Sequence, residues 1–357
     1  SRGLGDVYQR QVIDQILSKD IVSIIGGEGV SLKRAGVNYE CCCPFHKEKT
    51  PSFKVSPVKG IFTCFGCSAK GKAISFVMML YNMTFPEAVE YLAKKLNIEY
   101  KAEELTPEQK EARFRRSRIF EINQVALEYF RESYKQSLPA QKYATKERGF
   151  KEETIDNMLI GFAPYKGGFR EYATQKGYKD QLLLDADLVR RSERDGSLYD
   201  TFRGRLMFTI RDRTGNIVGF SGRLMDKENP KKLPKYINTG DTAVYKKGEH
   251  LFAYFESARQ AAAVRTMNLV EGNPDAIRMH QIGVDNTVAP LGTALTPKQI
   301  ELIKKVADTV IIIGDMDDAG QKAVVKNAET MLRAGLAVRV MEIKDNYKDP
   351  DLSLIHI

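Results

Sequence analysis

The sequence predicts a multidomain α+β and α/β protein, and three observations lead to this fold class. The chain has 357 residues and 43% hydrophobic content, which is enough for two or three cores of ordinary domain size. Its first hundred residues combine helical patterns with a cluster of cysteines, and its last hundred alternate short apolar strands with helices. A mixed, basic block lies between them. We therefore expect a small cysteine-rich domain, a basic α+β subdomain and a parallel-sheet subdomain, in that order.

The first domain is expected over residues 1–100. An amphipathic opening helix is predicted from apolar residues at helical spacing: Val12, Ile13, Ile16 and Leu17. Two further helices are predicted over Ala73–Tyr81 and Phe85–Leu96, the second of them capped by Thr84. Between these helical regions, PSFKVSP and GIFTC are strand-like and are joined by a turn at Pro57–Gly60. This pattern predicts an antiparallel ribbon.

The rest of the chain is divided by composition. Residues 101–118 are charged and poor in apolar side chains, which indicates a linker running into a helix. In the basic subdomain, residues 119–257, the stretches RLMFTI and NIVGFSGR flank turn residues Asp212–Asn216 and predict a hairpin. Over residues 258–351, NLVEG, NTVAP, TVIIIGD and AVRVMEI predict parallel strands covered by helices. Residues 352–357, LSLIHI, are interpreted as a non-native tail.

One structural zinc ion is predicted from cysteine spacing. The expected ligands form two pairs with two residues between partners: Cys43 and His46, Cys64 and Cys67. Cys41 and Cys42 would leave four and three residues before the histidine, so we interpret them as bystanders. The odd number of cysteines, five, favours a metal site in a reducing compartment over a disulfide framework. Buried reduced cysteines beside an unrelated histidine are the alternative.

Acidic residues follow three of the predicted parallel strands. They are Glu271 with Asp275, then Asp315 with Asp317, and finally Asp349 with Asp351. Because the carboxyl ends of parallel strands share one edge of a sheet, these side chains should converge. Two unit charges about 4 Å apart repel by roughly 4 kcal/mol at an effective dielectric near 20, so a cation is expected among them. Oxygen ligands favour Mg²⁺ or Mn²⁺. Helix capping is the alternative for any single acid.

The middle of the chain is basic. From Arg203 to Lys235, nine Lys or Arg side chains oppose three acids, a local balance of +6 (9 − 3). This density favours a phosphate-binding groove, although a solvated basic face is the simpler interpretation for Lys227, Lys231 and Lys232. The net charge of +9 also favours a polyanionic partner. No apolar run is long enough to span a bilayer and no secretion signal begins the chain, so no membrane association and a cytoplasmic location are expected.

An ordered set of short motifs runs between Val7 and about Asp351: NYECCCPFHKEKTPSF, CFGC, KERGF, FRGRLMF, GFSGRL, KYIN, VEGNPD, LGTALT, GDMDDAG and KDPD. In this order the set resembles the bacterial replicative DNA primases of the DnaG type. The resemblance implies a zinc ribbon domain, a basic subdomain and a Rossmann-like Toprim catalytic subdomain. It implies a nucleotidyltransferase with DNA-directed RNA polymerase activity, which makes short RNA primers for replication by two-metal chemistry.

The resemblance also implies partners. These are a single-stranded DNA template, ribonucleoside triphosphates, an RNA–DNA hybrid product, a single-stranded DNA-binding protein, and a replicative helicase contacted through a region absent from this chain. A monomer at the replication fork is expected. Alternatives are another zinc and Toprim protein, either a topoisomerase or nuclease-like enzyme or a non-catalytic recombination-mediator scaffold.

Residue roles carried over from the family fall into three groups. Glu271, Asp315 and Asp317 are the expected catalytic metal ligands, with Glu271 as either ligand or base, and Asp275, Asp349 and Asp351 occupy further acidic positions. Nucleic-acid or nucleotide binding is expected of Arg148, Arg223, Lys235, Tyr236 and Asn238. Asn273 stands where the family often has an aromatic residue. On the ribbon, template contact is expected from Lys47, Lys49, Lys54 and Phe53.

Overall fold

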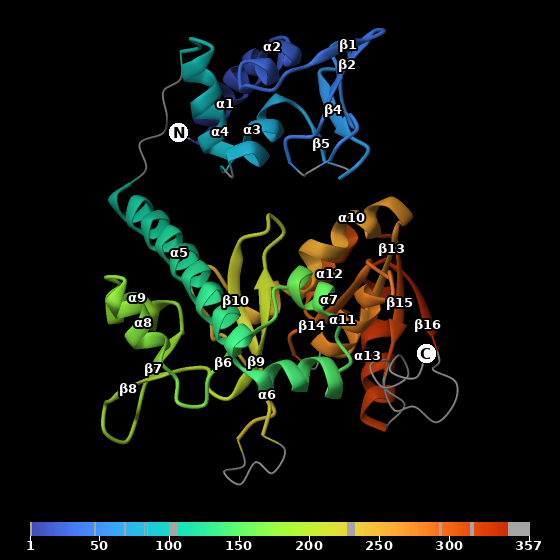
Figure 1. The fold of residues 1–357 in the computed structure, drawn as a ribbon. Coiled ribbons are helices and arrows are strands. Elements are labelled where there is room, and N and C mark those ends of the chain that lie inside the picture. The colour runs from blue at the N-terminus through green and yellow to red at the C-terminus, as the bar shows by residue number, and fades with distance from the viewer. Residues whose placement is uncertain are drawn as a thin grey trace. The chain divides into compact units, whose positions relative to one another are not determined.

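The computed structural model describes residues 2–45, 48–67, 69–81, 83, 85–99, 106–226, 233–292, 295–314 and 318–341 (Figure 1). The chain divides into two compact units, Ser1–Thr106 and Pro107–Ile357. Several residues with predicted roles lie outside the described residues: His46, Lys47, Thr84, Lys227, Lys231, Lys232, Asp315, Asp317, Asp349, Asp351 and the tail 352–357. Among the described helices, none has both the length and the apolar content needed to cross a bilayer.

The first unit is an antiparallel sheet packed against helices (Figure 1). The sheet has the order of the sequence: β1 (Lys33–Ala35), β2 (Asn38–Cys41), β3 (Phe53–Ser56), β4 (Ile61–Cys64) and β5 (Lys70–Gly71). The helices are α1 (Arg2–Leu17), α2 (Ile21–Gly26), α3 (Ala73–Tyr81) and α4 (Phe85–Lys95). The predicted helices and the β3–β4 ribbon are therefore confirmed. Strands β1, β2 and β5 were not predicted, because they are short and mostly polar.

One face of this sheet is core and the other is open. Phe53 and Phe62 are fully buried, and their rings stack with centroids 5.2 Å apart. The expectation that Phe53 contacts a template is thus wrong, because strand alternation turns its neighbour Lys54 outward instead. Paired residues of adjacent strands lie on the same face. The register therefore places one row across the open face: Lys33, Glu40, Lys54, Thr63 and Lys70.

The second unit begins with the long helix α5 (Pro107–Gln136), and the predicted end of the linker at residue 118 lies within it. The helix packs on an antiparallel sheet, where Phe130 meets Phe220 edge to face at 5.2 Å. The sheet order is β11 (Tyr236–Asn238), β10 (Ile217–Leu224), β9 (Arg205–Arg211) and β6 (Gly161–Ala163). The predicted β9–β10 hairpin is confirmed.

Shorter elements surround this sheet. They are α6 (Leu138–Lys142), the π-helix η1 (Tyr143–Glu147), α7 (Glu152–Asn157), α8 (Phe169–Gln175), α9 (Asp180–Asp185) and the hairpin of β7 (Val189–Arg191) and β8 (Leu198–Asp200). The π-helix leads directly into Arg148, at the KERGF motif. Such turns are rare and often mark functional sites.

The remainder of the second unit is built on the predicted parallel sheet. Its order is β12 (Leu251–Phe252), β14 (Thr287–Pro290), β13 (Thr266–Val270), β15 (Thr309–Ile313) and β16 (Ala337–Met341), with only β12 antiparallel. The flanking helices are η2 (Lys247–Glu249), α10 (Tyr254–Val264), α11 (Asn273–Gln281), α12 (Pro297–Lys304) and α13 (Asp318–Arg333). Because Val270 pairs with Ile313, β13 and β15 end at the same level. Glu271 and Gly314 therefore emerge side by side.

Candidate active site and zinc centre

Three of the predicted zinc ligands converge at one end of the ribbon. The sulfur atoms of Cys43, Cys64 and Cys67 all lie within 4.8 Å of one another, and those of Cys43 and Cys67 are 3.6 Å apart. Ligands at about 2.3 Å in a tetrahedron around zinc place sulfur atoms about 3.8 Å apart, so the spacing fits this metal. His46 lies outside the described residues, and its role as the fourth ligand stays a prediction.

Backbone amides support these thiols. The amide of Cys67 donates to Cys64 Sγ at 3.2 Å, and that of Phe45 donates to Cys43 Sγ at 3.4 Å. Such contacts stabilise thiolate charge and orient a metal ligand. Cys41 is buried, but among the described residues its sulfur is not part of the cluster formed by Cys43, Cys64 and Cys67. Its interpretation as a bystander stays a prediction.

A carboxylate that sequence reasoning did not single out links the two halves of this centre. Glu48 Oε1 accepts hydrogen bonds from the amides of Cys43, at 2.6 Å, and Ser52, at 3.2 Å. Its Oε2 accepts from the Ser52 hydroxyl at 2.6 Å, and that hydroxyl lies 3.1 Å from Cys64 Sγ. Glu48 thus connects Cys43, of the first predicted ligand pair, to Cys64, of the second, through Ser52. Its only signal in the sequence is its place in the motif HKEKTPSF.

In the second unit, Glu271 stands at the carboxyl edge of the parallel sheet. A side chain on Gly314 would collide with Cγ2 of Val324 on α13, and its Cβ would lie 3.4 Å from Glu271 Oε1. Only glycine therefore lets the end of β15 approach both the helix and the carboxylate. The residue after Gly314 is Asp315, which lies outside the described residues. Its convergence with Glu271 stays a prediction.

Asp275 lies near this edge but has a capping contact. It is 8% exposed, and its Oδ2 accepts a hydrogen bond from the amide of Gly272 at 3.1 Å. This is the arrangement of a helix N-terminus, in which a first-turn acid satisfies a free backbone amide. The capping alternative accounts for this contact, and a metal role for Asp275 stays a prediction.

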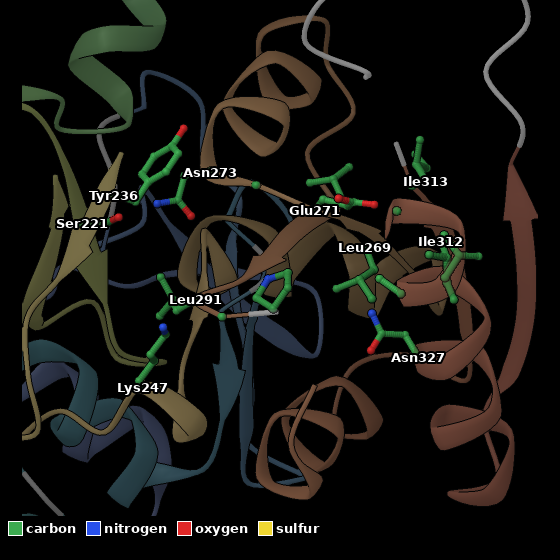
Figure 2. Close-up of a pocket in the computed structure, with 18 of the residues that line it drawn as sticks. Ser221, Tyr236, Lys247, Leu269, Glu271, Asn273, Leu291, Ile312, Ile313 and Asn327 are labelled. Carbon is green, nitrogen blue, oxygen red and sulfur yellow. The ribbon is translucent and has the colours of Figure 1, made fainter. Parts of the chain in front are cut away.

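A pocket of about 650 Å³ opens beside Glu271 (Figure 2). Its apolar side is formed by the sheet and α13, through Leu269, Ile312 and Val324 among others. Its polar side combines Asn273, at the start of α11, with residues from earlier in the chain: Ser221, Tyr236, Asn238 and Lys247. The predicted residues Tyr236 and Asn238 thus line the same pocket as Glu271, and the Asn238 amide donates to the carbonyl of Leu291 at 2.9 Å. Lys247 was not predicted, since nothing in its local sequence distinguishes it.

A second pocket, of about 380 Å³, collects the predicted basic residues Arg148, Arg223 and Lys235. Glu147 and Asp226 also line it, so three cations face two acids. This arrangement is suited to an anion with several oxygens, such as a phosphate.

Two tyrosines fix the guanidinium of Arg223 at this second pocket. Its Nε donates to the hydroxyl of Tyr143 at 2.9 Å, and its Nη1 donates to the hydroxyl of Tyr236. Burial raises the pKa of Tyr236 to about 12, so it remains a neutral phenol. Tyr236 also lines the first pocket, and it therefore connects the two. Tyr143 was missed in the sequence because it lies outside the short motif that marks Arg148.

Two other arginines of the basic block are not available to a nucleic acid. Arg205 is 3% exposed and donates to the carbonyls of Gly222, Pro234 and Lys235, so it holds strands β10 and β11 together. Arg211 is paired with Glu256 at 2.5 Å. The charge count of the sequence therefore overstated the free positive charge, because it could not separate buried cations from exposed ones.

The loop that carries Arg148 is tied to helix α11. Arg278 Nη1 donates to the carbonyl of Gly149 at 2.5 Å, and the side-chain amide of Gln281 donates to the same oxygen at 3.0 Å. Gln281 also accepts from the amide of Lys151 at 2.7 Å. The helix that begins beside Glu271 thus fixes the position of the basic pocket relative to the acidic edge.

Comparisons with protein families match three consecutive segments of the chain. Residues 8–108 match the CHC2 zinc finger, residues 129–258 match the N-terminal domain of the DNA primase catalytic core, and residues 268–354 match a Toprim-like family. The three matches follow the order of the sequence-based resemblance.

Similar curated proteins and solved structures agree with these matches. A DNA primase of Clostridium acetobutylicum is 38% identical over 93% of this chain and 54% of its own length, and one of Pasteurella multocida is 38% identical over 96% and 59%. The chain spans little more than half of these relatives. The structure of the zinc-binding and RNA polymerase domains of the Aquifex aeolicus primase is 34% identical, with a TM-score of 0.62, over 97% of this chain and 82% of that one. A DnaG primase catalytic domain bound to single-stranded DNA is 30% identical, with a TM-score of 0.58, over 68% and 76%.

Proposed function

Because this chain belongs to the family of DnaG-type bacterial DNA primases, we propose that it synthesises short RNA primers on single-stranded DNA. The reaction would be nucleotidyl transfer from ribonucleoside triphosphates to a 3′-hydroxyl. The observation that carries the proposal is the link between an acidic strand edge at Glu271 and a basic pocket around Arg223: Tyr236 lines the pocket beside Glu271 and accepts a hydrogen bond from Arg223.

The acidic edge would hold the catalytic metals. Glu271, Asp315 and Asp317 are the expected ligands, and Glu271 alone of the three lies among the described residues. Asp275, Asp349 and Asp351 are further candidates. Bound Mg²⁺ or Mn²⁺ would supply activation of the 3′-hydroxyl and charge neutralisation at the leaving pyrophosphate. The register of β13 and β15 supports this assignment, since it brings Glu271 and Gly314 level at one edge.

The basic pocket would hold phosphates of the nucleotide or of the nucleic acid. Arg148, Arg223 and Lys235 converge there, and the two tyrosines keep the Arg223 guanidinium in one orientation. Asn238 would act from the neighbouring pocket, where it is anchored to Leu291. Charge-assisted hydrogen bonds of this kind are short and roughly twice as strong as neutral ones.

The zinc unit would contact the template with its open sheet face. Lys33, Lys54 and Lys70 share the row established by the strand register. Phe65, between the zinc cysteines, is 71% exposed, and Lys54 Nζ lies 5.8 Å from its ring centroid. Exposed aromatic rings beside cations bind single strands by stacking and by charge. Phe65 therefore replaces Phe53 as the stacking residue.

The remaining partners and the location follow from the family. We propose a cytoplasmic monomer at the replication fork that releases an RNA–DNA hybrid and works with a replicative helicase and a single-stranded DNA-binding protein. The proposed organisation is a zinc domain over residues 1–100, a linker over 101–118, a basic subdomain over 119–257 and a catalytic subdomain over 258–351.

The proposal is tested with single-stranded DNA, labelled ribonucleotides and Mg²⁺. We expect short RNA from the unchanged chain and none from Glu271→Gln, which keeps the shape of the side chain but removes its charge. Glu301→Gln, on the polar face of α12, is the matched control and should leave the yield unchanged. Equal yields from the unchanged chain and Glu271→Gln would contradict the assignment of the acidic edge. A chain that binds single-stranded DNA but makes no RNA would favour the non-catalytic scaffold.

A further inference from the structure

Two buried polar side chains in the pocket beside Glu271 have no partner of their own. Asn273, at the start of α11, is 6% exposed, and Ser221, on β10, is 1% exposed. Both line the pocket, and Figure 2 shows the Asn273 amide directed toward the side where Tyr236 and Ser221 lie. Within the described part of the chain, neither side chain makes a hydrogen bond. The polar groups of both side chains are open to the pocket, so a ligand there can form hydrogen bonds with them.

The chemistry of the neighbouring residues narrows what that ligand group can be. Phosphates are suited to the cationic pocket of Arg148, Arg223 and Lys235, and metal ions to the carboxylate edge. Ser221 and Asn273 are neutral, and each both donates and accepts. The Tyr236 hydroxyl, by contrast, already accepts a hydrogen bond from Arg223. The pair is therefore complementary to a neutral group that itself donates and accepts, which describes a hydroxyl.

Within a nucleotide, such hydroxyls belong to the sugar. A template-directed enzyme must accept four different bases, whose hydrogen-bonding edges are taken up by pairing. Fixed polar groups beside the acidic edge are thus suited to the sugar, which is the same in all four nucleotides. We propose that Asn273 and Ser221 bind the 2′-hydroxyl of the nucleotide's ribose and so select ribonucleotides over 2′-deoxyribonucleotides. This inference rests on the proposed function and names the determinant of its sugar specificity.

The size of the effect follows from the same reasoning. A site that hydrogen-bonds a substrate hydroxyl discriminates strongly against an analogue without it, because its own buried groups are then left unpaired. Loss of one such contact is expected to lower the preference for ribonucleotides by about 10-fold to 100-fold. The absolute rate with deoxyribonucleotides should change little, since they make no use of the contact.

The test compares ATP with 2′-deoxy-ATP as the incoming nucleotide on one DNA template. The ratio of kcat/KM for the two is expected to fall by about 10-fold or more in Asn273→Ala and in Ser221→Ala. Asn273→Leu preserves the shape of the side chain and serves if the alanine variant does not fold. Asn286→Ala is the matched control, because it also removes an asparagine amide, which donates to the carbonyl of Thr266 at 2.8 Å, but Asn286 does not line the pocket. An unchanged ratio in folded Asn273 and Ser221 variants would overturn the inference.

Equilibrium binding separates this inference from the proposed function. ATP and 2′-deoxy-ATP are titrated into the whole chain with Mg²⁺, without template. One outcome is that the chain makes no RNA but binds ATP more tightly than 2′-deoxy-ATP, and that Asn273→Ala removes this preference. The sugar site would then be supported and the primase assignment contradicted. If RNA is made and the preference is equal in all variants, the primase assignment stands and the sugar site is wrong.

Discussion

Glu48 Oε1 accepts a hydrogen bond from the backbone amide of Cys43 at 2.6 Å, so an acid that is not a predicted ligand anchors one of the ligands. The same carboxylate holds the Ser52 hydroxyl, which touches Cys64 Sγ. Groups that orient metal ligands commonly affect metal affinity by about 10-fold to 100-fold when they are replaced. We therefore expect Glu48→Gln to release zinc to a chromogenic chelator at least about 10-fold faster than the unchanged chain.

The control for this prediction is Glu40→Gln, in the row of the open sheet face, away from the thiols. It should release zinc at the unchanged rate. Equal release from Glu48→Gln and the unchanged chain would mean that the cysteine pairs are fixed by the strands alone.

Tyr143→Phe should weaken phosphate binding without loosening the fold. The substitution removes the hydroxyl that accepts from Arg223 Nε at 2.9 Å, and the guanidinium then loses one of its two fixed contacts. The net contribution of a hydrogen bond to a charged group is about 1.5–3 kcal/mol. KM for the nucleotide is therefore expected to rise by roughly 10-fold to 100-fold, while kcat changes little. Steady-state primer synthesis measures both quantities.

Tyr129→Phe is the matched control for the Tyr143 variant. It also loses a phenol contact, the 3.0 Å hydrogen bond to the carbonyl of Gly167, but it does not line either pocket. Its KM should match that of the unchanged chain. A similar rise in both variants would indicate a general loss of rigidity and no specific positioning of Arg223.

Lys54→Ala and Phe65→Ala should reduce template binding by different mechanisms. Removal of the lysine should reduce the slope of log K against log salt concentration by about one, because one phosphate contact is lost. Removal of the exposed ring loses a stacking contact of about 1–3 kcal/mol per base with little change in salt dependence. Fluorescence anisotropy with a labelled single strand at several salt concentrations distinguishes the two.

Val58→Ala controls for the zinc-unit variants, since Val58 is 89% exposed in the turn between β3 and β4, away from Lys54 and Phe65. It should bind like the unchanged chain. If Phe65→Ala also binds normally, the open face does not engage the template through this ring.

The stability of the second unit should fall below neutral pH through His280. Burial lowers the pKa of this histidine below its ordinary value, although the carbonyl of Thr287, Glu256 and Asp285 oppose the shift. The unfolded chain therefore binds the proton more readily, and stability is lost as pH falls through the ordinary histidine pKa, about 6.5. Melting temperatures at pH 7.5 and pH 5 measure the loss.

His280→Gln should show a smaller drop in melting temperature between these two pH values than the unchanged chain. Glutamine can still donate to the Thr287 carbonyl, which the histidine ring approaches at 2.9 Å. An identical drop in both proteins would assign the acid sensitivity to other groups.

The sequence allowed the elements and part of the site to be predicted, because their determinants are local. The cysteine spacing brought Cys43 and Cys64 together across the ribbon, and strand periodicity placed Glu271 at the end of β13. These features depend on intervals of a few residues or on the edge shared by parallel strands. They need no knowledge of which distant segments pack together.

Other features required the packing itself. Lys247 and Tyr143 reach the two pockets from separate turns, and no local pattern marks either residue. Arg205 was counted with the basic residues of the groove, whereas in the structure its side chain is buried and donates to three backbone carbonyls. Phe53 was assigned to the wrong face, because the start of β3, and hence the phase of its alternation, was not known.

The contact between Gly314 and Val324 has a consequence for sequence variation in this family. The space that a side chain at 314 would need is occupied by the Val324 methyl group, so the two positions share one fixed volume. Homologues with alanine at position 314 should carry a residue smaller than valine at position 324. The two positions should therefore covary in an alignment. In the laboratory, Gly314→Ala should abolish priming, and adding Val324→Ala should restore part of it.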